Sequence, residues 1–183
     1  AQLIARRQVF PCYFGSALKL EGVDALLEGL AQYALTPSYP ADFAARVFKI
    51  ARDGSERLTY LKVTGGSLKV RTLLSGGEGG AGWQEKVNQI RVYSGEKYQT
   101  IEEAEAGTVC AATGLPHTRP GDALGAEQPG EEPVLEPVLT YRVELPEAYD
   151  AHTMLKNLRQ LEEEDPQLRV VWNEGHGEIQ VQL

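Results

Sequence analysis

The turn Gly15-Ser16-Ala17-Leu18 has the residue types and the position that binding of a nucleotide base requires. It follows a β-type run and precedes a helical pattern, and ligands of doubly wound nucleotide folds bind at the carboxyl ends of strands. A Ser-Ala turn there can present backbone N–H donors to a base edge. Guanine offers its O6 acceptor at that place and adenine an amino donor, so a fixed N–H favours guanine. Alone, these few residues do not identify a nucleotide site.

Other candidate chemical motifs have simpler structural explanations. The glycine-rich stretch 75–82 lacks the Gly-Lys-Ser/Thr ending of a phosphate-binding loop and precedes a strand pattern, so it predicts a flexible hairpin loop. Ser16 lacks the Gly-x-Ser-x-Gly frame of a nucleophile elbow. Three histidines lie too far apart in the sequence for metal-ligand spacing, and we expect them at the surface: His117, His152 and His176.

Composition restricts the class of protein and its compartment. No run of 18 apolar residues occurs, and the first ten residues lack the apolar core and cleavage site of a signal peptide, which excludes membrane-spanning and secreted proteins. Cys12 and Cys110 lie in apolar surroundings without a CxxC motif. They predict buried, reduced thiols of a cytoplasmic protein, with a disulfide or a metal pair as the alternative.

The net charge of -8 is distributed unevenly. Residues 126–183 carry 13 acidic and 4 basic side chains, whereas residues 46–97 carry 10 basic and 5 acidic ones. A basic middle segment permits a surface that faces phosphates, but a solvated β face with scattered Lys and Arg has the same composition.

The periodicity divides the chain into three zones. Residues 8–14 predict a strand, and Val23, Leu26, Leu27, Leu30 and Ala34 follow it as one helical stripe that the prolines of TPSYP end. The second zone predicts short strands of a small antiparallel barrel or sandwich. These strands are expected at 43–51, 57–63, 67–74, 85–94 and 107–115, with Gly65 and Gly66 at a hairpin turn that needs positive φ.

The third zone follows a linker at 126–137 that is rich in Pro and Glu. It predicts a strand at 138–146, a helix at 151–164 with Asp150 as N-cap, and two strands within 168–183. The acidic run at the end of the helix, residues 162–165, is expected on a solvated face. This β-α-β-β order begins a ferredoxin-like α+β sandwich, which needs another helix and strand to close.

Together these stretches resemble translational GTPases of the elongation factor G type. YFGSALKLEGVDALLEGLAQYALTPS is similar to their last guanine-recognition motif and closing helix. RLTYLKVTGGSLKVRTLL and EEAEAGTVCAATGL resemble their second domain, and LTYRVELP with the residues up to 183 resembles the opening of their third. Three features resemble the tetracycline-resistance ribosomal protection proteins more than elongation factor G itself. They are the stretch FPCYFGSALKLEGVD, the short connection from VFKI to RLTY, and the polar residue Glu56.

The resemblance implies a mainly β fragment of a longer cytoplasmic factor. Residues 1–39 would be the strand-helix remnant of a GTP-binding domain, 40–125 a six-stranded-type translation-factor β-barrel (domain II), 126–137 a linker and 138–183 a truncated ferredoxin-like domain III. The parent would bind GTP and Mg²⁺ and hydrolyse GTP on the ribosome. The fragment alone would bind neither and catalyse nothing.

Site residues follow from the same resemblance. Ser16, Ala17 and Leu18 would recognise guanine in the parent. Candidate contacts to the rRNA of the small subunit lie in the basic segment: Arg57, Lys62, Lys69 and Arg71. An incomplete third domain would leave apolar surface exposed and favour weak self-association. The alternatives are a stand-alone RNA-binding β-barrel and a protein-interaction module.

Overall fold

The computed structural model describes residues 2–35, 37–76, 82–130, 137–146, 148–165 and 167–182. The chain divides into two compact units, residues 1–38 and residues 39–183. Most of the glycine-rich stretch 75–82 and half of the predicted linker lie outside the described residues. No helix in the described part of the chain has the length and apolar character needed to cross a membrane.

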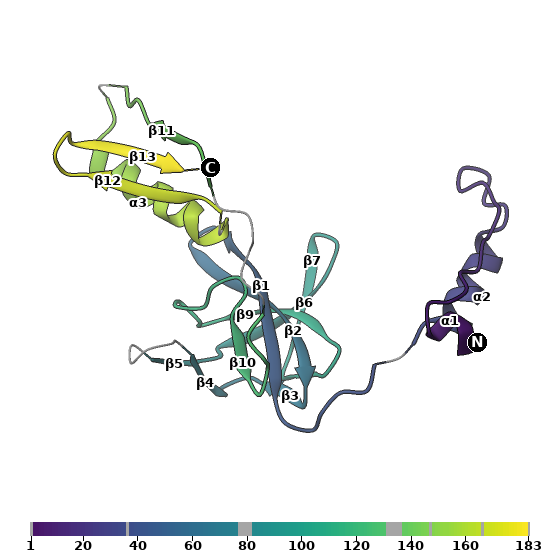
Figure 1. The fold of residues 1–183 in the computed structure, drawn as a ribbon. Helices are drawn as coiled ribbons and strands as arrows, with labels where there is room; N and C mark the ends of the chain where they lie inside the picture. The colour runs from purple at the N-terminus through teal and green to yellow at the C-terminus, as the bar shows by residue number, and fades with distance from the viewer. Residues whose placement is uncertain are drawn as a thin grey trace. The chain divides into compact units, whose positions relative to one another are not determined.

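The first unit contains the helices α1 (Gln2–Ala5) and α2 (Val23–Tyr33) (Figure 1). The predicted helix is confirmed as α2, but the strand prediction for residues 8–14 is wrong. A strand is stabilised by a neighbouring strand, and the described part of this unit offers only the isolated bridge between Ser16 and Glu21. Cys12, predicted to be buried, is exposed.

The second unit is built on a six-stranded antiparallel sheet (Figure 1). Its order is β10-β1-β2-β9-β6-β7. The strands are β1 (Ala44–Asp53), β2 (Glu56–Gly65), β6 (Gln89–Ser94), β7 (Lys97–Ile101), β9 (Val109–Thr113) and β10 (Ala123–Gly125). The predicted mainly β architecture is confirmed. Among the described strands, the two edge strands β10 and β7 do not pair with one another.

Two short strand pairs complete this region: β3 (Ser67–Lys69) with β8 (Glu103–Glu105), and β4 (Leu73–Gly76) with β5 (Trp83–Lys86). The core lies between these pairs and the sheet and includes Ile50, Leu61, Leu68 and Ile90, all fully buried. Cys110 joins this core as predicted, and its burial raises the pKa of the thiol to about 11.

Two strand predictions are split in the structure, and further strands of this region lie outside the predicted stretches. The run 67–74 is split into β3 and β4 because Arg71 adopts a left-handed conformation with φ 71°. The run 85–94 is split because Val87 and Asn88 donate to carbonyls of Thr72 and Thr113 instead of continuing one ladder. β7 was not predicted, and β8 lies in a segment expected to separate strands. Gly66 has the expected positive φ of 52°, but Gly65 does not and is the last residue of β2. The predicted hairpin turn is wrong, because β3 pairs with β8 and not with β2.

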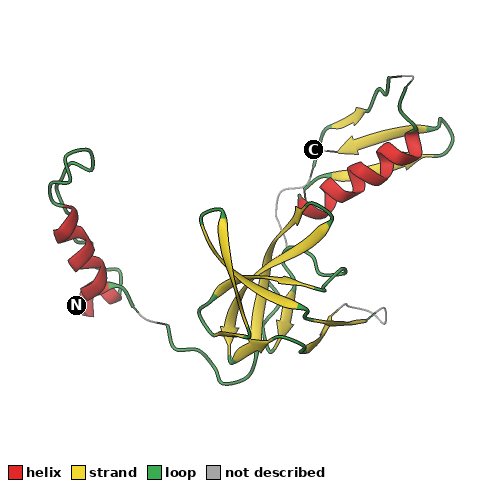
Figure 2. Cartoon of the chain, turned by 180° about the vertical axis from the view of Figure 1, so that it is seen from behind, coloured by secondary structure: helices red, strands yellow, loops and turns green. Residues whose placement is uncertain are grey.

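The C-terminal segment has the predicted β-α-β-β order. It comprises β11 (Thr140–Arg142), α3 (Ala151–Glu164), β12 (Arg169–Asn173) and β13 (Glu178–Gln182). The sheet order is β11-β13-β12, and α3 lies along one face of this sheet (Figure 2). Asp150 caps α3 as predicted, accepting a hydrogen bond of 2.8 Å from the Thr153 N–H. Leu155, Val170 and Ile179 form the small core.

Candidate functional site

The turn at residues 15–22 is closed by its own backbone. The Ser16 N–H donates to the Glu21 carbonyl at 2.9 Å, and the Glu21 N–H donates back at 3.1 Å. A side chain at position 15 would place its Cβ 2.4 Å from the same carbonyl, so only glycine fits. Gly22 then starts α2 with φ 73°.

This closure decides which donors the turn can offer to a ligand. The Ser16 N–H is used within the turn, whereas, among the described residues, no acceptor is bonded to the N–H of Ala17 or Leu18. The Leu18 side chain is almost fully exposed. The turn therefore presents two adjacent backbone donors, and guanine recognition by Ser16, Ala17 and Leu18 stays a prediction.

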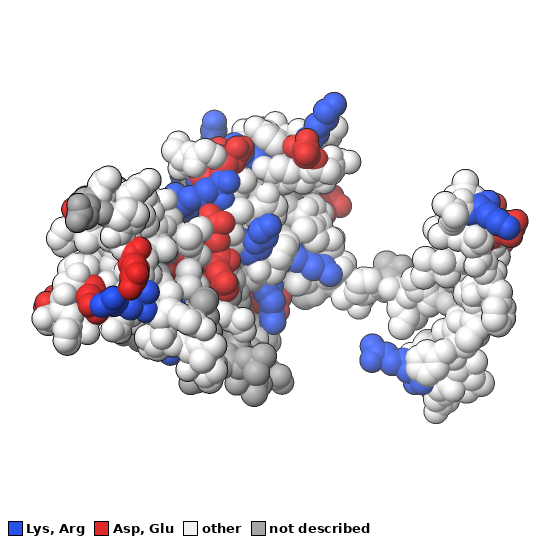
Figure 3. All heavy atoms as spheres, turned by 90° about the horizontal axis from the view of Figure 1, so that it is seen from above, with Lys and Arg blue, Asp and Glu red and all other residues white. Residues whose placement is uncertain are grey.

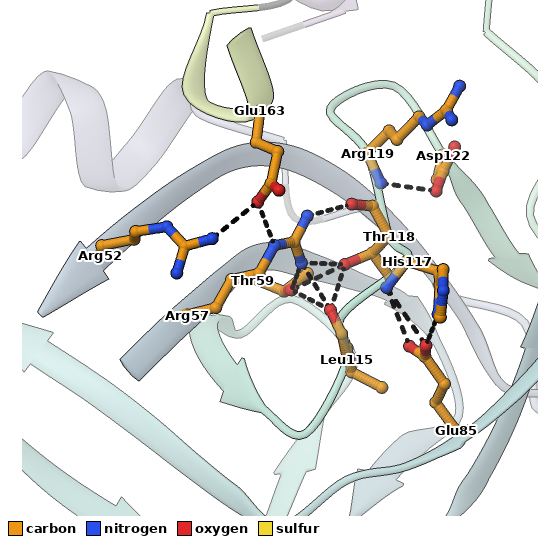
Figure 4. Close-up of polar contacts among 10 residues, drawn as sticks. All are labelled: Arg52, Arg57, Thr59, Glu85, Leu115, His117, Thr118, Arg119, Asp122 and Glu163. Carbon is orange, nitrogen blue, oxygen red and sulfur yellow. Dashed lines mark hydrogen bonds and ion pairs between the residues drawn. The ribbon is translucent and has the colours of Figure 1, made fainter. Parts of the chain in front are cut away.

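Arg57 is the most enclosed of the four predicted rRNA contacts (Figure 4). Its guanidinium donates to the carbonyls of Leu115 and Thr118, and to the Thr118 and Thr59 hydroxyls at 3.1 and 3.3 Å. Thr118 is fully buried. Through these hydrogen bonds, the Arg57 side chain on β2 holds the loop that follows β9 in place. The role of Arg57 at rRNA stays a prediction.

The same guanidinium also reaches helix α3. Arg57 Nε donates to Glu163 Oε2 at 3.0 Å, and Arg52 Nη2 donates to that oxygen at 3.1 Å (Figure 4). The prediction that the acidic run 162–165 lies on a merely solvated face is therefore wrong for Glu163. Sequence spacing could not show this, because more than 100 residues separate the partners.

The four predicted rRNA contacts do not lie on one face. Arg57 and Lys62 are five positions apart on β2, and successive side chains alternate between the faces of a strand, so the two point to opposite sides. Lys62 is exposed, as is Lys69 on β3, whose Nζ lies 3.5 Å from Glu103. Arg71 is exposed in the turn after β3. Basic and acidic side chains are intermixed on the surface seen in Figure 3.

Aromatic side chains form a row on the outer face of the sheet, which sequence reasoning missed. The rings of Phe48, Tyr60, Tyr93 and Tyr98 follow one another with centroid distances of 6.3, 5.7 and 5.3 Å. Part of the row could have been predicted from the sequence. Tyr93 and Tyr98 flank the turn Ser94-Gly95-Glu96-Lys97, and a hairpin at this turn places the two rings opposite one another. The contact between Tyr60 and Tyr93 has no local signal, because it depends on β9 inserting between β2 and β6.

A cavity of about 540 Å³ opens between β2, β6 and the loop after β9. Arg57, Arg91 and the amides of Asn88 and Gln89 line it. Arg91 is buried, and its guanidinium donates to Glu56 and Gln89. Its Nη1 has no hydrogen-bond partner among the described residues. Within the described ranges, no group of three or more His, Cys, Asp or Glu side chains is placed to hold a metal ion. His117 instead bonds Glu85.

Comparisons with known proteins identify the central region. Residues 42–127 match the family model described as Elongation factor G domain 2. The chain is 30% identical over 204 residues to Elongation factor G 1 of Geobacter sulfurreducens, covering 93% of this chain and 28% of that protein. It is 27% identical over 216 residues to Elongation factor G 2 of Syntrophus aciditrophicus, covering 98% and 31%.

A solved structure extends the likeness to the fold. A crystal structure of a protein from Thermus thermophilus aligns with a TM-score of 0.73 and 26% identity over 99% of this chain and 28% of that one. The chain spans less than a third of the length of each of these relatives. It contains a domain 2 of the elongation factor G type and is a distant homologue of that factor.

Proposed function

We propose that this homologue of elongation factor G is a part of a ribosome-binding translational GTPase that acts in protein biosynthesis in the cytoplasm. The observation that carries the proposal is the extent of the similarity, which covers 93% of the chain and not only the matched domain. We assign residues 1–39 to the end of a GTP-binding domain, 40–125 to a domain II of barrel type, 126–137 to a linker and 138–183 to the start of domain III.

The first unit supplies guanine recognition in this proposal. Ala17 and Leu18 present backbone donors, and Ser16 closes the turn that holds them. The exposed side chains of Phe10 and Phe14 would be covered by the rest of the GTP-binding domain. The 183 residues contain no Gly-x-x-x-x-Gly-Lys-Ser/Thr sequence, and phosphates and Mg²⁺ provide much of the positioning of GTP. We therefore expect the chain alone neither to bind GTP at micromolar concentration nor to hydrolyse it.

The second unit supplies the ribosome contact. Lys62, Lys69 and Arg71 are exposed and can reach rRNA phosphates of the small subunit, where contacts position a protein without reading sequence. Arg57 remains a candidate, although its guanidinium already serves the loop after β9.

A finer proposal concerns the branch of the family. FPCYFGSALKLEGVD and the two-residue connection between β1 and β2 favour the tetracycline-resistance ribosomal protection proteins over the translocating factor. Expression of the full-length gene in a susceptible bacterium tests this. Growth on tetracycline supports the assignment, whereas complementation of an elongation factor G defect without resistance contradicts it.

Cosedimentation with purified small ribosomal subunits tests the ribosome contact. We expect the chain to pellet with the subunits. Replacing Lys62 and Arg71 by Ala should weaken binding. The plot of the logarithm of the binding constant against the logarithm of the salt concentration should become less steep by about 1.4–1.8, because two phosphate contacts are lost. The matched control replaces Lys156 and Arg169, also exposed, and should leave the slope unchanged. A wild-type chain that stays in the supernatant at low salt contradicts the proposal.

A further inference from the structure

The aromatic row on the outer face of the sheet combines features that the proposed function does not use. Four rings from four strands lie in sequence across the sheet: Phe48 on β1, Tyr60 on β2, Tyr93 on β6 and Tyr98 on β7. They are tilted by 36–56° against their neighbours. Together they cross the sheet from β1 to the edge strand β7.

A small residue allows the row to cross the intervening strand. β9 separates β2 from β6, and its Ala111 pairs with Tyr60 on one side and Arg91 on the other. Ala111 is fully buried although it belongs to the outer face, which shows that neighbouring side chains cover its methyl group. A larger side chain at this position would separate the rings of Tyr60 and Tyr93.

The row faces away from the core. Along β2, Leu61 and Val63 point into the core cluster, so the alternation places Tyr60 on the opposite face. On β6, Ile90 and Val92 belong to the core side, and Tyr93 therefore shares the outer face. The ends of the row are open to solvent, with Phe48 49% and Tyr98 43% exposed.

Cations lie among the rings. Lys49 Nζ is 5.6 Å from the centroid of Tyr60, and Arg91 Cζ is 4.5 Å from that of Tyr98. Asp53 and Glu56 both pair with Arg91, and Arg46 pairs with Glu127. Lys49 and Lys62, both exposed, are the described cations of this face that form no ion pair with another described residue. Single-stranded nucleic acids are bound by this combination of stacking rings and backbone-neutralising cations.

We propose that this row is a stacking platform for unpaired bases of RNA, with Phe48 and Tyr98 as its accessible rings and Lys49 and Lys62 as its phosphate contacts. The choice of RNA as the partner rests on the proposed ribosome binding. The inference goes beyond it, because phosphate contacts alone do not distinguish paired from unpaired RNA, whereas stacking on a ring requires a base outside a helix.

Fluorescence anisotropy with the full 183-residue chain tests the platform directly. The probes are a fluorescein-labelled 12-nucleotide oligo(U) and an RNA duplex of the same length. We expect the single strand to bind at least ten-fold more tightly than the duplex. Tyr98→Ala and Phe48→Ala should each weaken oligo(U) binding about five-fold or more, the loss typical of one stacked base. Tyr98→Phe keeps the ring and should bind like wild type.

Tyr141→Ala is the matched control, because Tyr141 has similar exposure, 52%, but lies on β11 outside the row. Circular dichroism and thermal unfolding of each variant separate a lost ligand contact from a lost fold. Equal affinity for single strand and duplex overturns the proposal. So does a Tyr98→Ala protein that is folded and binds oligo(U) as well as the Tyr141→Ala control, since the rings would then only pack on one another.

Small-subunit cosedimentation distinguishes the two proposals. If wild type and Tyr98→Ala bind oligo(U) equally and both pellet with small subunits, the platform is wrong and the ribosome contact stands. If the chain binds oligo(U) through Tyr98 but ignores small subunits, the platform stands and the proposed function is wrong.

Discussion

The six-stranded sheet and the C-terminal β-α-β-β segment are built from similar strands but bury very different cores. Two strand pairs cover the sheet, and core residues such as Ile50, Leu61 and Ile90 are fully buried from solvent. In the C-terminal segment one helix covers one face of three strands, and the buried cluster comprises three of the described residues, Leu155, Val170 and Ile179. Strand sequence alone therefore does not determine burial; the number of covering layers does.

The largest expected difference is in hydrogen exchange. Backbone amides of residues 138–182 should exchange at least ten-fold faster than those of β1, β2 and β9, because a small core opens locally at lower free energy. Val138, Leu139 and Tyr141 are exposed and offer a surface for weak self-association. Sedimentation velocity establishes the monomer before exchange is measured. Equal protection in a demonstrated monomer would contradict the lower stability expected of the C-terminal segment.

Core truncations sharpen the same contrast. Leu61→Ala should lower the free energy of unfolding by about 2–5 kcal/mol, with Leu155→Ala near the lower end, because Leu155 lies at the border of a small cluster. Trp83 packs on the sheet core and Trp172 on the C-terminal one, so single-tryptophan variants report each region separately. A single coincident denaturant transition at both tryptophans would contradict two regions of different stability.

Arg57 joins the two regions and provides the next effect in size. Arg57→Ala should destabilise the sheet region by about 1–3 kcal/mol, because the carbonyl of the buried Thr118 loses its donor. Glu163→Gln should cost about 0–1 kcal/mol, since Glu163 is partly exposed. Lys62→Ala, on the opposite face of the same strand, is the control. Equal costs for Arg57→Ala and Lys62→Ala would show that the loop after β9 holds without Arg57.

The smallest expected effect depends on pH. The hydrogen bond from Thr64, assisted by Arg46, lowers the pKa of Glu127 below its ordinary value of 4.5. A carboxyl whose folded pKa is depressed contributes stability above its unfolded pKa and loses it as the pH falls through the folded one. The stability difference between wild type and Glu127→Gln should therefore shrink between pH 6 and pH 3. A difference that is constant over this range would contradict the ion pair.

The sequence predicted those elements that have a strong local period. α2, α3, β1 and β2 occupy the expected stretches, and Asp150 caps α3, because helical stripes and N-caps are encoded within a few residues. β7 was missed because its residues KYQTI are largely exposed and present little apolar alternation. A strand at residues 8–14 was predicted from residue types alone, and the described unit contains no partner strand for it.

The candidate sites, like the helices and strands, were predicted only where their pattern is local in the sequence. The tight turn at Ser16 was visible in the sequence because glycine and small residues mark it locally. The aromatic row depends on Ala111 of β9 lying between Tyr60 and Arg91. Glu163 accepts a hydrogen bond from Arg57, which lies 106 positions earlier in the sequence. Such contacts arise from long-range pairing, for which a single sequence carries no local pattern.

The measurement that tests the central claim most directly is hydrogen exchange of the chain with and without purified small ribosomal subunits. A translation factor that docks through its domain II should gain protection in β2, β3, β6 and β7, while residues 140–182 change less. Protection of the outer strands by small subunits, reversed by high salt, is the predicted result. Unchanged exchange throughout the sheet at saturating subunit concentration would contradict the account.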